Sequence, residues 1–374
     1  MSGLLLWVLI RVAIFAVATA LVVWLAKWSK SPWKKPFLMA GAASVGLIVA
    51  GCVLYAWLLS ALNVPRDYGW SILFIAPLFN GLLFVFLFYW FCQKYLPEEN
   101  KKPGFVVLVL LAPLFVSLLQ LAVLFVLLLE GSICILMASP FWTSGTMLGA
   151  LGGWFIAKIM SKITGRQIMS LMLVGFLPLG LQQVESRYAH EAYVPVVSQI
   201  EINAPPETVF DLVVAFPEIT DRQPKSWGEG MFLLGLPEPE KATVECRDVD
   251  CLRRCHFTQN VYFDERITVY KPGEELSFTV QAVVGPQHPV TGADPHVLPG
   301  GVYFETDRGQ FLLSEIAPGK TLLKGTSWYR MRSSFNWYAQ PWAEWMLHAI
   351  HNRVLRHVKT QAEKTLAEKI AYRS

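Results

Sequence analysis

The chain has 374 residues, of which 54% are hydrophobic and only 16% charged, and its formal net charge is +4. This composition is too apolar for a single soluble domain, and the small positive charge, which basic loops between apolar runs explain, excludes a nucleic-acid-binding protein. Nearly all of the apolar excess precedes about residue 182, so we expect a transmembrane helical domain at 1–185 and a globular domain at 196–374.

The first domain contains six apolar runs, most of which approach the roughly 20 residues that a helix needs to cross a bilayer. They lie at 4–26, 37–62, 71–92, 105–129, 144–159 and 168–181. The sixth run is short and contains Pro178, so it either crosses a thinned bilayer or lies at the interface. The stretch 131–142 is too short to cross before Pro140, and we expect a re-entrant or interfacial segment there.

The loop charges predict a topology. Lysine and arginine are concentrated in the loops that follow the first, third and fifth runs, whereas the alternate loops carry almost none. If all six runs cross, the positive-inside rule makes the chain a multi-pass protein of the cell membrane with an extracytoplasmic globular domain. If the sixth run does not cross, the same charges place that domain in the cytosol.

The fifth run contains the stretch GTMLGALGG, in which Gly145, Gly149 and Gly153 recur every four residues. Small residues at this spacing let a second helix approach the backbone closely. We therefore expect a helix-packing face here. Since the six runs contain few acidic residues and no histidine, they predict no transport chemistry.

The globular domain opens with SQIEINAPPETVFDLVVAFPEI from Ser198. Alternate residues from Val196 to Ile202 share one face of a predicted strand, and the proline pair 205–206 suits the first turn of a helix. Later stretches alternate like strands and are joined by the turns KPGE and APGK, which predicts an antiparallel meander. From 341 to 372 the chain has no internal proline and predicts a terminal helix about 45 Å long.

This order of elements is carried by the stretches IEINAPPETVFDLVVAFPEI, ITVYKPGEELSFTV, LLKGTSWY and WAEWMLHAIHNRVLRHVKTQAE. It resembles the START-like, polyketide-cyclase-like helix-grip superfamily, also called SRPBCC, over about 196–363. The resemblance implies an α+β domain in which a curved antiparallel sheet wraps around the long C-terminal helix and encloses an apolar cavity. The superfamily includes lipid and quinone binders, hormone receptors, cyclases and hydrolases, so the fold does not select a reaction.

The terminal helix carries a stripe in which Glu344, His348 and His351 share a face with the apolar residues Leu355 and Val358. If this face meets the sheet, it presents a polar patch to the cavity. A competing apolar face around Trp342 and Trp345 would instead turn Glu344 and His348 toward solvent.

Aromatic residues on the predicted strands are candidates for the cavity wall, although core packing explains them equally well. We predict a ligand-binding wall composed of Phe257, Tyr303, Phe311, Trp328, Tyr329, Glu344, His348 and His351. The cavity should measure a few hundred Å³, as small-molecule sites usually do. The long loop that holds His288 and His296 is either a lid over it or a mobile surface loop.

Three cysteines, Cys246, Cys251 and Cys255, cluster in the globular domain without a CxxC pair. An extracytoplasmic location would permit one disulfide among them, and zinc binding with His256 is a weaker alternative because the spacing differs from common zinc motifs. We expect no metal site and no cofactor, since the sequence lacks a phosphate-binding glycine loop, a GxSxG motif and a dinucleotide fingerprint.

Three classes of function remain open. The first is membrane-anchored binding or transfer of an apolar ligand, such as a membrane lipid, a quinone or an isoprenoid-like molecule. Such ligands dissolve in the bilayer, so their effective concentration near a cavity held at the membrane is high. The second is a cyclase- or hydrolase-type enzyme for a hydrophobic substrate, in which Glu344, His348 or His351 acts as acid or base. The third is a structural or regulatory membrane protein without a ligand. The sequence does not determine the oligomeric state.

Overall fold

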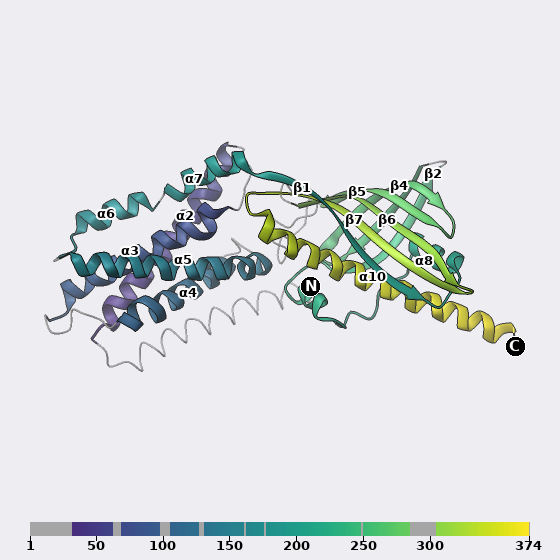
Figure 1. The fold of residues 1–374 in the computed structure, drawn as a ribbon, viewed down its shortest axis with the longest axis horizontal. Coiled ribbons are helices and arrows are strands. Elements are labelled where there is room, and N and C mark those ends of the chain that lie inside the picture. The colour runs from purple at the N-terminus through teal and green to yellow at the C-terminus, as the bar shows by residue number, and fades with distance from the viewer. Residues whose placement is uncertain are drawn as a thin grey trace. The chain divides into compact units, whose positions relative to one another are not determined.

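The computed structural model describes residues 32–62, 69–97, 105–126, 131–160, 162–175, 177–247, 250–284 and 304–373. The chain divides into two compact units, Met1–Ala189 with Ser333–Phe335, and His190–Arg332 with Asn336–Ser374. The first is called the helical unit and the second the sheet unit (Figure 1).

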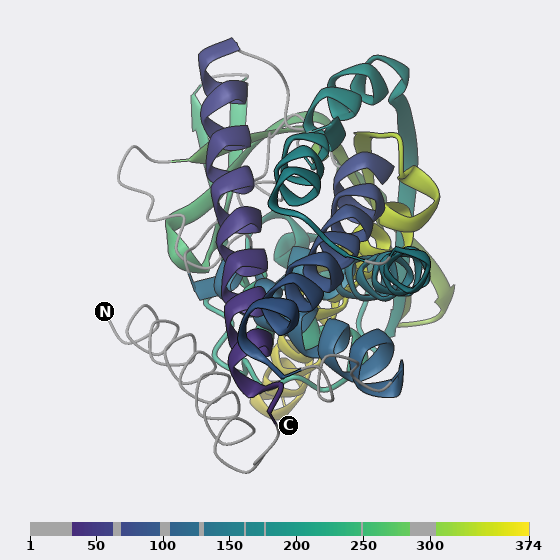
Figure 2. The same ribbon diagram turned by 90° about the vertical axis from the view of Figure 1, so that its left-hand side faces the viewer.

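The helical unit is built from helices of very different lengths (Figure 2). In chain order its elements are α2 (Lys34–Leu62), η1 (Ser71–Ile75), α3 (Ala76–Tyr95), η3 (Val107–Leu111), α4 (Ala112–Val126), α5 (Ser132–Ile159), α6 (Gly165–Val174), α7 (Leu177–Glu185) and η4 (Ser186–Tyr188). Within the described residues, three segments are long and apolar enough to cross a membrane: Ser71–Tyr95, Leu108–Phe125 and Ser132–Ile159.

These segments confirm apolar helices at the third, fourth and fifth predicted runs, although the helix at the fifth begins earlier, at Ser132. The second run forms α2. The first predicted run lies outside the described residues. The sixth run is not one helix but two, α6 and α7, of ten and nine residues. Gly175 is the C-cap of α6, and Pro178 lies in the first turn of α7, where its missing N–H is not needed.

The prediction of a separate re-entrant or interfacial segment at 131–142 is wrong, because α5 is continuous from Ser132 to Ile159 and contains Pro140. A proline inside a helix leaves the carbonyl four residues earlier without its N–H donor. Here that carbonyl belongs to Leu136, and the hydroxyl of Ser139 donates a hydrogen bond to it at 2.9 Å. The neighbouring serine therefore supplies the donor that the proline removes, and the helix continues.

Helices α3 and α5 pack with their backbones in close approach, as the glycine spacing predicts. A Cβ atom on Gly149 would lie 1.8 Å from the carbonyl oxygen of Leu78, and one on Gly81 would lie 2.0 Å from that of Thr146. Neither position has room for a side chain. The two helices therefore contact each other through glycine on both sides.

A buried polar network joins four helices of this unit. The hydroxyl of Ser44 in α2 donates to Asn80 Oδ1 in α3 at 2.6 Å, and Gln120 Nε2 in α4 donates to the same oxygen at 2.7 Å. Trp142 Nε1 in α5 donates to Gln120 Oε1 at 3.0 Å. Because each of these groups is shielded from water, the network fixes which helix faces meet.

The sheet unit contains one seven-stranded sheet in the order β1-β7-β6-β5-β4-β3-β2, in which the successive neighbours from β2 to β7 are antiparallel. Its strands are β1 (His190–Ile202), β2 (Pro239–Arg247), β3 (Asp250–Phe257), β4 (Val261–Lys271), β5 (Glu275–Val284), β6 (Phe304–Ala317) and β7 (Lys320–Ser333). Its helices are α8 (Pro206–Val214), η5 (Trp227–Glu229), α9 (Gly230–Leu233), η6 (Thr258–Asn260) and α10 (Asn336–Arg373).

Two tight turns set the register of the sheet. The KPGE turn joins β4 to β5 with Gly273 at φ +75°, and the APGK turn joins β6 to β7 with Gly319 at φ +71°. Only glycine adopts these backbone angles without strain, so the turns occur where the sequence predicts them.

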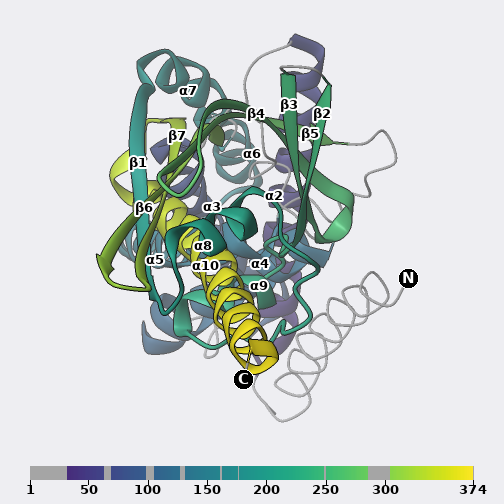
Figure 3. The ribbon, with the colours of Figure 1, turned by 90° about the vertical axis from the view of Figure 1, so that its right-hand side faces the viewer.

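The sheet curves around α10 (Figure 3). Alternate strand residues such as Leu276 and Leu323 pack against Leu355, Val358 and Ala362 of the helix, and all five are almost completely buried. An antiparallel sheet that encloses a long C-terminal helix is a helix-grip-like arrangement, as expected. This contact leaves the more N-terminal part of α10 to form one wall of a cavity.

We predict that Gly149→Ala destabilises the helical unit much more than Gly152→Ala, although both changes add one methyl group to α5. The added carbon at 149 meets the backbone of α3, whereas nothing lies within 4 Å of a Cβ at 152. Thermal unfolding of the full-length protein in detergent measures the difference, which should be about 1 to 3 kcal/mol, as for other overpacked sites. Equal melting temperatures would contradict the close approach of α3 and α5.

Candidate functional site

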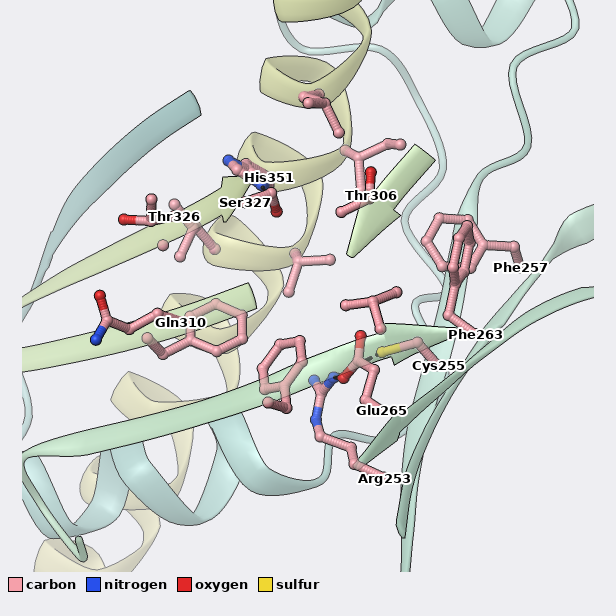
Figure 4. Close-up of a pocket in the computed structure, with 18 residues that line it drawn as sticks. Arg253, Cys255, Phe257, Phe263, Glu265, Thr306, Gln310, Thr326, Ser327 and His351 are labelled. Carbon is pink, nitrogen blue, oxygen red and sulfur yellow. Dashed lines mark hydrogen bonds and ion pairs between the residues drawn. The ribbon is translucent and has the colours of Figure 1, made fainter. Parts of the chain in front are cut away.

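An apolar cavity of about 110 Å³ lies between α10 and the sheet within the sheet unit (Figure 4). Four phenylalanines from successive strands line it, and four aliphatic residues of α10 form its other wall. The phenylalanines are Phe257, Phe263, Phe278 and Phe311, and the aliphatic residues are Leu347, Ile350, Val354 and Leu355. A second cavity of about 60 Å³ shares five lining residues with the first: Phe257, Phe263, Thr306, Leu347 and Ile350.

The cavity is smaller than the few hundred Å³ that the sequence predicted. The rings of Phe278 and Phe311, whose centroids are 6.1 Å apart, fill part of the space that the helix and sheet enclose. Phe257 and Phe263 form a second edge-to-face pair at 5.0 Å. The aromatic side chains on the inner sheet face therefore reduce the open volume.

One polar part of the cavity wall is formed by Ser327 and His351, and Ser198 and His348 continue its hydrogen bonds away from the cavity. Ser327 Oγ on β7 lies 2.8 Å from His351 Nε2 on α10. Ser198 Oγ on β1 lies 3.2 Å from His351 Nδ1 and 2.8 Å from His348 Nδ1. Burial lowers the pKa of His351 to about 4, and the neighbouring His348 adds to the shift, so His351 is neutral near pH 7.

A buried ion pair forms another polar part of the wall. Arg253 on β3 and Glu265 on β4 are opposite each other in the strand register, and Arg253 Nη1 donates to the Glu265 carboxylate. Arg253 Nη1 also contacts Cys255 Sγ at 2.7 Å, and Nε donates to the carbonyl of Val214 at 3.0 Å. Among the described residues, no group accepts a hydrogen bond from Arg253 Nη2, which leaves one donor group of this cavity-lining side chain unused.

Burial in this apolar wall shifts the pKa values of the two side chains that contact the Arg253 guanidinium, Glu265 and Cys255. Burial raises the pKa of the Glu265 carboxyl, and the positive charge of Arg253 counteracts only part of that shift. Burial also raises the pKa of the Cys255 thiol, which therefore stays protonated and is a poor nucleophile. Cys255 is a free cysteine, whereas Cys251 is disulfide-bonded.

Three of the eight residues predicted for the wall line the cavity: Phe257, Phe311 and His351. His348 reaches it only through Ser198. Glu344 accepts a hydrogen bond from Gln340 at 2.8 Å and does not line the cavity.

The other predicted wall residues lie elsewhere. Trp328 is on the outer sheet face, where its ring lies 4.4 Å from the guanidinium of its register partner Arg308. Tyr329 is buried but packs on Phe304, with ring centroids 5.2 Å apart, and does not line the cavity. Tyr303 lies outside the described residues, as do His288 and His296.

Sequence reasoning missed four polar residues of the site: Ser198, Arg253, Glu265 and Ser327. The alternation of inward- and outward-facing residues along a strand indicates an inward position for two of them, Arg253 and Ser198. Arg253 is four residues before Phe257 and therefore shares its inward face. Ser198 lies on the face of β1 that carries the buried residues Val196 and Ile202.

No group of three or more histidine, cysteine, aspartate or glutamate side chains in the described part of the chain is arranged to hold a metal ion. The polar groups that reach the cavity are instead suited to hydrogen bonding with a neutral molecule. His351, Ser327 and the unused Nη2 of Arg253 offer both donors and acceptors.

No protein-family model matches the sequence, and no curated protein matches it. Among solved structures, the Zhui aromatase/cyclase from a Streptomyces species is 16% identical and has a TM-score of 0.28, covering 47% of this chain and 96% of that one. A conserved protein from Geobacillus kaustophilus is 13% identical with a TM-score of 0.29, covering 46% and 97%. The di-domain ARO/CYC StfQ from the steffimycin biosynthetic pathway is 10% identical with a TM-score of 0.31, covering 54% and 60%.

We predict that the protein loses stability as the pH falls from 6.5 toward 4, and that His351→Gln removes part of this loss. In the unfolded chain His351 takes up a proton near its ordinary pKa of 6.5, whereas in the folded protein it resists protonation down to about pH 4. The unfolded state therefore binds more protons across this window, and the contribution of His351 should be on the order of 3 kcal/mol.

The measurement is the melting temperature of the full-length protein at several pH values, with His351→Gln beside the wild type. The two curves should converge as the pH decreases. Parallel curves would mean that His351 is not held neutral by burial.

Proposed function

We propose that this protein binds a small apolar molecule in the cavity between α10 and the sheet, and that its apolar helices keep that cavity at a membrane. The observation that carries the proposal is the cavity wall itself, in which nine aliphatic and aromatic side chains surround a smaller set of convergent polar groups. Such a composition is typical of small-molecule sites.

The size of the cavity narrows the class of ligand. An apolar protein cavity of about 150 Å³ accommodates benzene. The cavities of about 110 and 60 Å³ therefore suit a single ring or a short branched chain better than a whole lipid. A quinone-like or isoprenoid-like ligand would place its ring or one end of its chain here.

Membrane attachment is supported by three segments that are long and apolar enough to cross a bilayer. An apolar ligand dissolved in that bilayer is present at high effective concentration near a tethered cavity, so modest affinity is sufficient. The proposed cycle is uptake of the ligand from the membrane and its release to the membrane or to a partner.

An enzymatic function is the second candidate, because Ser327 Oγ lies 2.8 Å from His351 Nε2 in the geometry of a nucleophile and its base. The low pKa of His351 makes it a weak base at neutral pH. Its other nitrogen faces the Ser198 hydroxyl, which carries no negative charge to stabilise an imidazolium. These two features favour binding over catalysis.

We further propose that the sheet unit is extracytoplasmic. The distribution of basic loops supports this orientation, and so does the disulfide at Cys251, because disulfides persist mainly outside the reducing cytosol. The orientation requires the run that forms α6 and α7 to cross the membrane as two consecutive short helices.

For the ligand, we predict that the wild-type protein, purified from cells and extracted with organic solvent, releases a small apolar compound that Ile350→Trp does not retain. Ile350 lines both cavities, and an indole at this position would occupy them. Ile370→Trp is the matched control, because residue 370 lies on the same helix and is 61% exposed. Mass spectrometry that finds the same compounds in all three proteins would contradict the proposed site.

For the orientation, we predict that a membrane-impermeant maleimide labels Tyr372→Cys in intact cells but labels Lys94→Cys only after the cells are permeabilised. Residue 372 is 92% exposed near the end of α10, and Lys94 lies at the end of α3 next to a basic loop. The reverse pattern would place the sheet unit in the cytosol.

A further inference from the structure

A continuous chain of hydrogen-bonding groups leads from half-buried His348 to the cavity. It consists of His348, Ser198, His351 and Ser327, and is called here the histidine–serine chain. The successive separations are 2.8 Å from His348 Nδ1 to Ser198 Oγ, 3.2 Å from Ser198 Oγ to His351 Nδ1, and 2.8 Å from His351 Nε2 to Ser327 Oγ. Ser327 is the member that lines the cavity together with His351 (Figure 4).

Each inner member of this chain can both donate and accept. A serine hydroxyl carries one proton and two lone pairs, and a neutral imidazole carries one N–H and one acceptor nitrogen. His351 is neutral because burial lowers its pKa to about 4. With one proton on each member, the chain has only two fully satisfied arrangements, and they run in opposite directions.

In the outward arrangement, Ser327 donates to His351 Nε2, His351 Nδ1–H donates to Ser198, and Ser198 donates to His348 Nδ1. Ser327 then offers only lone pairs to the cavity. In the inward arrangement every bond is reversed, so His351 Nε2–H donates to Ser327 and the Ser327 hydroxyl proton is free to point into the cavity. One rearrangement of protons therefore changes Ser327 from a group that can only accept from a ligand to one that can donate to it.

We propose that the cavity binds single-ring compounds that carry one polar group, and that the histidine–serine chain reverses to accept either a hydrogen-bond donor or an acceptor on that ring. This inference rests on the proposed function and adds the chemical class of the ligand. Hydroxyl- and carbonyl-bearing forms of one ring, such as a hydroquinone and its quinone, belong to this class. A site with a fixed donor or a fixed acceptor would discriminate between them.

The experiment uses three five-membered rings of similar size as probes: pyrrole, which only donates, cyclopentanone, which only accepts, and cyclopentane, which does neither. Calorimetry of the full-length protein in nanodiscs measures their dissociation constants. Ile350→Trp, in which an indole fills the cavity, measures the heat of probe that enters the nanodisc lipid, and this heat is subtracted. Wild type should bind pyrrole and cyclopentanone each about tenfold more tightly than cyclopentane, the value of one net hydrogen bond.

Two substitutions separate the members of the chain. Ser327→Ala should weaken pyrrole and cyclopentanone toward the affinity of cyclopentane, because the chain then no longer meets the ligand; Arg253 Nη2 remains as a donor on the same wall. Ser198→Ala should weaken pyrrole about tenfold and leave cyclopentanone unchanged. Without Ser198, a proton on His351 Nδ1 would be a buried donor without a partner, so His351 keeps its proton on Nε2 and donates to Ser327. Pyrrole could then use only the second lone pair of Ser327 and would leave the Ser327 hydroxyl proton without an acceptor, whereas cyclopentanone accepts that proton.

Two control substitutions test whether the effects are specific to the histidine–serine chain. Ser277→Ala removes a hydroxyl that is 2% exposed on β5, outside the cavity lining, and should leave all three affinities unchanged. Ser198→Val excludes a replacement water and should reproduce the selectivity of Ser198→Ala. Melting temperatures establish that each variant is folded.

Nitrogen-15 NMR of histidine-labelled protein reads the reversal directly, with the His351 signals assigned by their loss in His351→Gln. Pyrrole should place the imidazole proton of His351 on Nδ1, and cyclopentanone should place it on Nε2. A proton that stays on one nitrogen with both probes would overturn the proposed reversal.

The remaining outcomes distinguish this inference from the proposed function. Equal affinity of the wild type for all three probes would refute the chain as the recognition element while supporting an apolar site. Equal weakening of pyrrole and cyclopentanone by Ser198→Ala would refute the reversal alone. Binding of no probe above the Ile350→Trp reference would refute the proposed function itself.

Discussion

Burying a polar or charged group without a partner is costly, and the architecture of both units depends on the partners that the largest buried polar side chains find inside the protein. In the sheet unit, Arg353 of α10 is 1% exposed and is held by Glu229 and Glu238, while Arg356 pairs with the same Glu229. Removing one partner would leave a bare charge in the interior, so the segment that carries Glu229 has to remain on α10. Hydrogen bonds impose the same requirement on the helical unit, where Gln120 bonds to groups on three other helices.

The cavity contains both satisfied and unsatisfied polar groups. The carboxylate of Glu265 and the imidazole of His351 have protein partners, whereas Nη2 of Arg253 has none among the described residues. A closed, fully paired core would need no ligand. The unused donor, next to open space lined by phenylalanine rings, supports the proposal that this cavity binds a ligand.

The order of strands and helices could be predicted from the sequence, because proline and glycine mark the turns and period-two alternation marks the strands. The same alternation identifies Phe257 and Phe311 as inward-facing. Alternation alone could not determine which face of β7 is turned inward. The polar Ser327 faces the cavity, and the large Trp328 faces outward against Arg308. Hydrophobicity favours the opposite choice, and only the position of His351 on α10 decides it.

Arg253 and Glu265 lie opposite each other on adjacent strands, and this pairing restricts how the sequence can change over time. Losing either charge alone strands the other in a low-dielectric interior, whereas replacing both with apolar side chains of similar volume is often neutral or stabilising. The two positions are therefore coupled. In evolution the ion pair can be lost only if both residues change together, or if a ligand or a neighbouring side chain first neutralises the charge that remains.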